Sequence, residues 1–142
     1  MKKIFYLLSA SVILIGACQQ QATKEAVKHQ QLSEEAITIH DEIMPQIAHF
    51  DKTTVKIDSI LGNLGQILKK DAKADTALIK TDLITLKSNL EAATDNMMTW
   101  MKEYMPDSTD VAYQQAEIEK IRAMKKQFED VSLESNKKLG KL

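Results

Sequence analysis

The side chains with the most distinctive chemistry in this chain are thioethers and an imidazole at helical spacing. His40 and Met44 lie four residues apart, and a second group of methionines surrounds Trp100 further along the chain. Thioether sulfur and imidazole nitrogen are donors that suit Cu(I). A tryptophan face beside such an ion adds a cation–π contact. The residues of this group are His40, Met44, Met97, Met98, Trp100, Met101, Tyr104 and Tyr113.

This group has two interpretations. In the one we favour, the methionines fill gaps around Pro45 and the aromatic rings close one end of the fold, so no cofactor is expected. His40 then forms a hydrogen bond to another helix, through Tyr104 or Glu117. The alternative is a Cu(I) site with Trp100 as a lid. Its ligands would be His40, Met44 and one of Met98 or Met101, with Met97, Tyr104 and Tyr113 lining the pocket.

The N-terminus has the three parts of an export signal. Met1-Lys2-Lys3 is basic, Ile4 to Ile15 is apolar, and Ile15-Gly16-Ala17-Cys18 ends the run with small residues. The apolar run is shorter than the roughly 20 residues of a membrane-spanning helix. Cys18 and the residues before it resemble the lipobox of bacterial lipoproteins. The resemblance implies a signal peptide at 1–17, a lipidated Gln-rich tether at 18–23, and one domain at 24–142.

The composition of the chain argues against several classes of function. The chain has 142 residues and a net charge of −1, and removal of Lys2 and Lys3 makes it more acidic. A mildly acidic domain has no electrostatic reason to bind nucleic acid. Cys18 is the single cysteine, so no disulfide is expected. The sequence contains no Gly-rich phosphate loop, nucleophile elbow or Ser/His/Asp arrangement, and we expect no enzymatic activity.

Apolar residues recur at spacings of three and four along almost the whole chain, which predicts helices. One stripe runs from Leu32 to Leu68, a second from Ile79 to Tyr104, and a less regular third from Val111 to Val131. The helices are therefore expected over about 24–70, 75–104 and 109–138. They predict an all-α, up-down antiparallel bundle of three long helices. The first is kinked at Pro45, or counts as two if the chain breaks there.

The turn between the first two helices has two candidate positions. The polar run at 69–75 is favoured, because the apolar stripe continues through Leu64 and Leu68. Gly62 and Gly65 then become positions where a neighbouring helix approaches closely, each weakening the helix by about 1 kcal/mol relative to Ala. The alternative turn lies at 62–65 itself.

These two turns place the methionines differently. A turn in the polar run sets Met44 opposite Trp100 and His40 opposite Tyr104, so that the whole group converges at one end of the bundle. A turn at 62–65 sets Met44 opposite Leu83 and scatters the group. The position of the turn thus decides whether a common site exists.

Two segments carry a resemblance to a known group of proteins. His40-Asp41-Glu42-Ile43-Met44-Pro45 and Met97-Met98-Thr99-Trp100-Met101 resemble short helical lipoproteins of Bacteroidetes-type bacteria, sometimes labelled "viral A-type inclusion protein". The group has no established function, so the resemblance implies an anchored helical fold and no activity. We expect a non-enzymatic binding or scaffolding module of the cell envelope. Its partners would be a lipid bilayer, which it binds through acylated Cys18, and an envelope protein. The expected location is outside the cytoplasm, in the periplasm or at the outer membrane.

Overall fold

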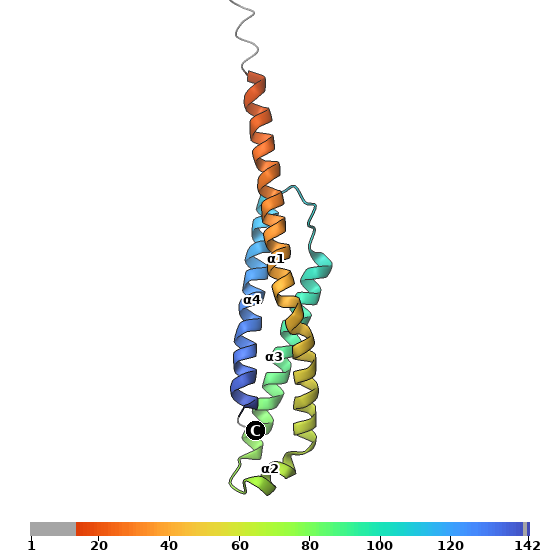
Figure 1. Cartoon of the computed structure of the whole chain (residues 1–142), viewed down its shortest axis with the longest axis vertical. Helices are drawn as coiled ribbons and strands as arrows, with labels where there is room; N and C mark the ends of the chain where they lie inside the picture. The colour runs from red at the N-terminus through yellow and green to blue at the C-terminus, as the bar shows by residue number, and fades with distance from the viewer. Residues whose placement is uncertain (1–13, 141) are drawn as a thin grey trace, which may run out of the picture.

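The computed structural model describes residues 14–140 and 142, with side chains from residue 27 onward except at residue 70. The helices are α1 (Leu14–Gly62), α2 (Leu64–Lys70), α3 (Thr76–Glu103) and α4 (Val111–Leu139), and this part of the chain contains no strand. The three long helices lie side by side, with α3 antiparallel to the other two (Figure 1). The predicted all-α, up-down bundle of three long helices is confirmed.

The core lies along the centre of the three long helices. On α1, Ala36, Ile43, Phe50 and Ile57 recur every seven residues and are buried, because seven residues make almost two full turns. The rings of Phe50 and Phe128 stack with centroids 4.8 Å apart and so join α1 to α4. Each fully buried side chain of this size contributes about 1.5–3 kcal/mol. The buried residues of α3 and α4 are Leu83, Leu86, Leu90, Ala93, Met97, Trp100, Ile118, Ile121, Met124, Phe128 and Val131.

The first long helix passes through Pro45 without a break. Pro45 lacks an N–H, so one helical hydrogen bond is missing, and α1 bends where its colour changes from orange to yellow (Figure 1). The kink predicted at Pro45 is therefore present, and the alternative of a full break there is wrong. The helix ends instead at Gly62, and Asn63 separates it from α2.

The chain reverses direction through α2 and the residues that follow it, at the foot of the bundle (Figure 1). This agrees with a turn in the polar run at 69–75, although the helix before it is interrupted at Asn63. The prediction for the two glycines is wrong. A Cβ built on Gly62 or Gly65 meets no atom within 4 Å, so no helix approaches closely there. Leu68, predicted to face the core, is 43% exposed.

Aspartates cap both later helices. Asp75 Oδ1 accepts hydrogen bonds from the N–H groups of Ala77 and Leu78, at 3.1 and 2.9 Å. Asp110 Oδ1 accepts from Ala112 and Tyr113 at the start of α4, at 2.8 and 3.1 Å. Each carboxylate satisfies N–H groups that have no partner within the helix. The third long helix thus begins two residues later than predicted, after Asp110.

The N-terminal part of α1 extends beyond the other two long helices (Figure 1). Residues 18–23, predicted as a tether, have a helical backbone within α1, whereas most of the predicted signal peptide, residues 1–13, lies outside the described residues. Within the described residues, none of the helices has an apolar stretch sufficient to cross a bilayer.

Candidate functional site

The structure brings His40 of α1 and Trp100 of α3 together near the upper end of the bundle. Their ring centroids are 6.0 Å apart, and the rings are tilted by 31°. Trp100 was predicted to lie opposite Met44, one helical turn further along α1. The prediction assumed two straight helices about one turn point, but α1 is bent and the chain reverses through α2. The predicted pairing is therefore displaced by one turn at this end of the bundle.

Trp100 is held firmly from two sides. Its indole N–H donates to Glu117 Oε2 at 2.9 Å, and its ring stacks on Tyr104 with centroids 4.5 Å apart. Trp100 and Glu117 are only 6% and 5% exposed. Lys120 Nζ lies 2.6 Å from the second carboxylate oxygen of Glu117, so both oxygens have partners. This ion pair raises the pKa of Lys120 above its ordinary value.

Gln114 organises the loop between α3 and α4. Its amide nitrogen donates to the carbonyl oxygens of Met105, Pro106 and Ser108, at 3.0–3.1 Å, and its carbonyl accepts from the Tyr104 hydroxyl at 2.8 Å. That hydroxyl also lies 3.2 Å from Ser33 Oγ of α1. Burial raises the pKa of Tyr104. The Tyr104 hydroxyl therefore joins Gln114 of α4 to Ser33 of α1 just beyond the end of α3.

Tyr113 completes the row of rings. Its centroid lies 6.4 Å from that of Tyr104, and its hydroxyl accepts from the backbone N–H of Met105 at 2.9 Å. The aromatic side chains predicted to line a pocket are thus together. They pack on one another and on the loop, and this agrees with the interpretation in which aromatic rings close one end of the bundle.

The predicted hydrogen bond from His40 to Tyr104 or Glu117 is wrong. His40 Nδ1 lies 2.9 Å from Oδ1 of its neighbour Asp41. Tyr104 instead donates to Gln114, and Glu117 accepts from Trp100. The sequence analysis predicted neither hydrogen bond. The sequence did contain a signal for these two contacts, because Gln114 and Glu117 lie on the apolar stripe that continues through Ile118 and Ile121. A polar residue in an apolar stripe indicates a buried polar contact.

The predicted methionines divide between core and surface. Met97 is fully buried and Met44 is half-buried against the core, whereas Met98 and Met101 are 51% and 40% exposed. Met98 and Met101 do not complete an enclosed pocket with Trp100. They lie on the outside of α3.

Met98 and Met101 nevertheless lie on the side of α3 that faces α1. Lys87 on this side pairs with Asp58 of α1 at 2.7 Å, and Glu91 and Thr94 line a cleft with residues of α1. Met101 follows Thr94 by seven residues and Met98 follows Glu91 by seven, which returns each to the same side of the helix.

The same reasoning places His40 and Met44 on the facing side of α1. Asp51 and Thr54 line the cleft with α3, while Asp58 pairs with Lys87. Met44 precedes Asp51 by seven residues, and His40 precedes Thr54 by fourteen. We call the upper part of this surface the α1–α3 flank, and its residues are Ile37, His40, Met44, Met98 and Met101.

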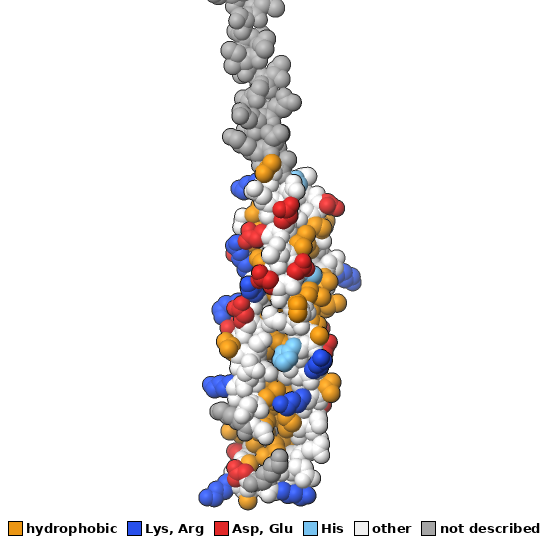
Figure 2. Space-filling model, viewed as in Figure 1, with side chains coloured by type: hydrophobic (Ala, Val, Ile, Leu, Met, Phe, Trp, Pro, Cys, Tyr) orange, Lys and Arg blue, Asp and Glu red, His pale blue; other side chains and the backbone are white. Residues whose placement is uncertain are grey.

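The α1–α3 flank is apolar and open to solvent. In Figure 2, orange side chains gather in the upper half of the molecule, toward the α3 side of α1, next to a pale blue histidine. Ile37 is 43% exposed, in addition to the exposed methionines. Scattered apolar residues are ordinary on a surface, but neighbouring ones on one seam indicate an interaction site.

Polar contacts join α4 to each of the other two long helices. Arg122 and Lys125 of α4 pair with Glu35 and Glu42 of α1. Between α3 and α4, Asn89 donates to Glu134 at 3.1 Å and Asn96 to Gln127 at 3.0 Å. Arg122 and Lys125 are therefore paired within the fold.

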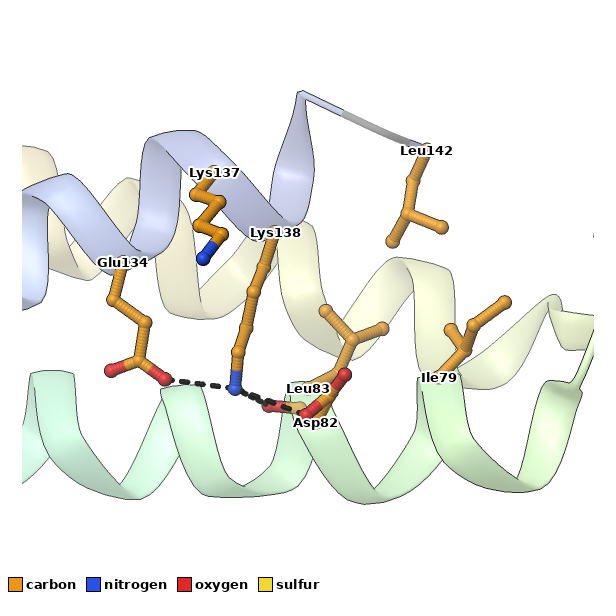
Figure 3. A pocket seen from close by; sticks show the side chains of 7 residues that line it. All are labelled: Ile79, Asp82, Leu83, Glu134, Lys137, Lys138 and Leu142. Atoms are coloured by element: carbon orange, nitrogen blue, oxygen red, sulfur yellow. Dashed lines mark hydrogen bonds and ion pairs between the residues drawn. The ribbon is translucent and has the colours of Figure 1, made fainter.

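A cleft of about 420 Å³ lies at the opposite end of the bundle, between α3 and the end of α4 (Figure 3). Lys138 crosses it to reach Asp82 and Glu134, at 3.2 and 2.8 Å, and Leu83 and Leu142 form its apolar part. The charged groups in this cleft neutralise one another. Throughout residues with described side chains, no group of three or more His, Cys, Asp or Glu residues is arranged to hold a metal ion.

Comparison of the chain with protein-family models, curated proteins and solved structures finds no match. The functional argument therefore depends on the residues and their geometry.

Proposed function

We propose that this chain is a lipid-anchored, non-enzymatic binding module of the bacterial cell envelope, and that the α1–α3 flank receives its partner. The observation that carries the binding role is the open apolar seam at this flank, with Met98 and Met101 on the surface. Methionine is flexible and polarizable, and it is common on surfaces that bind other proteins. The partner is expected to be an envelope protein.

The anchor is supported by the sequence around Cys18, where a basic start, an apolar run and small residues precede the single cysteine. Two or more acyl chains on one residue give stable attachment to a bilayer. The helical rise of 1.5 Å per residue puts about 20 Å of helix between Cys18 and Ser33, which contacts Tyr104 just after the end of α3. This segment would hold the flank away from the headgroups, so a protein fits the flank better than the membrane surface does.

The anchor is tested by metabolic labelling of the full chain with an alkyne fatty acid in a bacterium that processes lipoproteins. We expect the label on the wild-type protein and its loss in Cys18→Ser, together with release of the variant from the membrane fraction. Labelling that persists in Cys18→Ser, or an unlabelled wild type, contradicts the anchor.

The binding surface is tested by placing a photo-crosslinking amino acid at position 98 or 101 of the full chain in cells. Position 133 is the matched control, because Leu133 is exposed on α4 away from the flank. We expect one discrete crosslinked species from positions 98 and 101 and none from position 133. Equal crosslinking at all three positions, or none at any, contradicts the proposed surface.

A further inference from the structure

We propose that the α1–α3 flank binds one Cu(I) ion through the imidazole of His40 and the thioethers of Met44, Met98 and Met101. The inference rests on the proposed function, in that it uses the surface assigned there to binding. It adds the chemistry of the ligand. Its test is separate from the tests for the lipid anchor and the protein partner.

The backbone brings these four residues to one short stretch of one seam. His40 and Met44 are neighbours on successive turns of α1, and Met98 and Met101 are neighbours on successive turns of α3. The contact between His40 and Trp100 shows that these stretches of the two helices are level with each other. A methionine side chain has three rotatable bonds, so Met98 and Met101 can turn their sulfur atoms toward the seam.

His40 is prepared as a ligand by Asp41. The carboxylate of Asp41 accepts a hydrogen bond, so the Nδ1 atom that lies 2.9 Å away carries the proton. In the tautomer with the proton on Nδ1, the free lone pair of the ring is on Nε2. A carboxylate on one ring nitrogen and a metal on the other is the usual arrangement of metal-binding histidines. The His40 side chain is 19% exposed, which leaves the ring accessible.

Trp100 forms a fixed wall behind this histidine. The indole cannot move away easily, because Glu117 holds its N–H and Tyr104 stacks on its ring. An ion bound to His40 would therefore lie beside an aromatic ring. Tryptophan gives the strongest cation–π contacts among aromatic side chains, and its bulk excludes water from one side of the ion.

The donor set selects the metal. Three neutral thioethers and one imidazole suit soft Cu(I), whereas Mg²⁺ and Ca²⁺ prefer oxygen ligands and Zn²⁺ sites are built from Cys, His and carboxylates. The exposed Asp41 carboxylate adds a negative charge beside the site without being a soft ligand. A singly charged soft cation is therefore the best fit to the flank.

The test is an anaerobic titration of Cu(I), supplied from a competing chelator, into the full-length protein in detergent micelles. Trp100 is the only tryptophan, so its fluorescence reports on this site alone. We expect quenching that is complete at one equivalent. Met44→Leu, Met98→Leu and Met101→Leu remove sulfur with little change of volume, and each is expected to weaken Cu(I) binding by about tenfold or more.

Met124→Leu is the matched control, because Met124 lies on α4 outside the flank, and it should bind Cu(I) as the wild type does. His40→Leu is expected to abolish the quenching at one equivalent, with circular dichroism used to check that the variant is folded. NMR of labelled methionine methyl groups gives an independent readout with Ag(I), a redox-inert analogue. The signals of Met44, Met98 and Met101 should shift, and that of Met124 should not.

The proposal is overturned if the wild type shows no binding, or if affinity survives unchanged in the three Met→Leu variants. An Ag(I) shift at Met124 equal to those in the flank would show unspecific thioether binding and would also overturn it. Crosslinking at positions 98 and 101 would still stand in each case. Failure of the copper site is thus distinguishable from failure of the proposed binding surface.

Discussion

The indole N–H of Trp100 donates a 2.9 Å hydrogen bond to Glu117, and both side chains are more than nine-tenths buried. A carboxylate is rarely buried unless it is paired, because leaving water is costly for a charge. Here Trp100 and Lys120 divide the two oxygens between them. The contact fixes the ring between α3 and α4 and leaves it beside His40 of α1.

Trp100→Phe is expected to lower the free energy of unfolding by about 1–3 kcal/mol, because a buried carboxylate oxygen loses its donor. Urea unfolding followed by circular dichroism measures the change without the tryptophan. Glu117→Gln is the control, since its amide oxygen can still accept from the indole N–H, and its effect should be smaller. A larger loss in Glu117→Gln than in Trp100→Phe would contradict the role given to this hydrogen bond.

Gln114→Leu is expected to destabilise the protein by about 2–4 kcal/mol, because three backbone carbonyls and the Tyr104 hydroxyl lose a buried partner together. Hydrogen exchange should also become faster across residues 104–110, which include the three residues whose carbonyls Gln114 holds. Thermal unfolding and exchange mass spectrometry measure these effects. Gln115→Leu is the control, because exposed Gln115 contacts only Glu119 through its side chain, and it should change stability little. Similar exchange in both variants would contradict the prediction.

Gly65→Ala is expected to stabilise the protein by up to about 1 kcal/mol, since alanine is the better helix former. Gly65 lies within α2, its φ is not positive, and an added Cβ meets nothing within 4 Å. Gly62→Ala should act in the same direction at the end of α1. Denaturant midpoints of the two single variants and the double variant measure the gain. A loss of stability would mean that a neighbour does approach these positions.

The ion pair in the cleft of Figure 3 predicts a pH dependence. The hydrogen bond from Lys138 lowers the pKa of Glu134 below its ordinary value of 4.5, against the opposing effect of burial. The charged form of Glu134 is thus favoured by folding. Its contribution is present at neutral pH and is lost as the pH falls from 4.5 through the lowered pKa.

Glu134→Gln should therefore be less stable than the wild type at neutral pH, and the difference should close on acidification below that range. Melting temperatures measured across the pH range test this. The effect should be small, because the pair is partly exposed to solvent. A difference between the two proteins that stays constant at acidic pH would contradict the assignment.

The sequence was sufficient for the fold class because the periodicity is local. The stripe from Ile79 to Tyr104 predicts α3 and its buried side almost residue by residue, and Pro45 predicts the bend in α1. The helix break at Asn63 falls within 62–65, the less favoured of the two predicted turn positions. The apolar pattern continues past Asn63, and spacing alone carries no information on where the backbone leaves the helix.

For the candidate site, the sequence determined which side chains with soft donors exist and that helical spacing brings them to facing sides of two helices. The tertiary structure alone decided that His40 meets Trp100 and that Met98 and Met101 stay at the surface. It also decided that Glu117 and Gln114 take the polar contacts expected of His40. The physical reason is that helix periodicity fixes direction around one helix, whereas the register between helices depends on the bend, the turn and the packing of all three together.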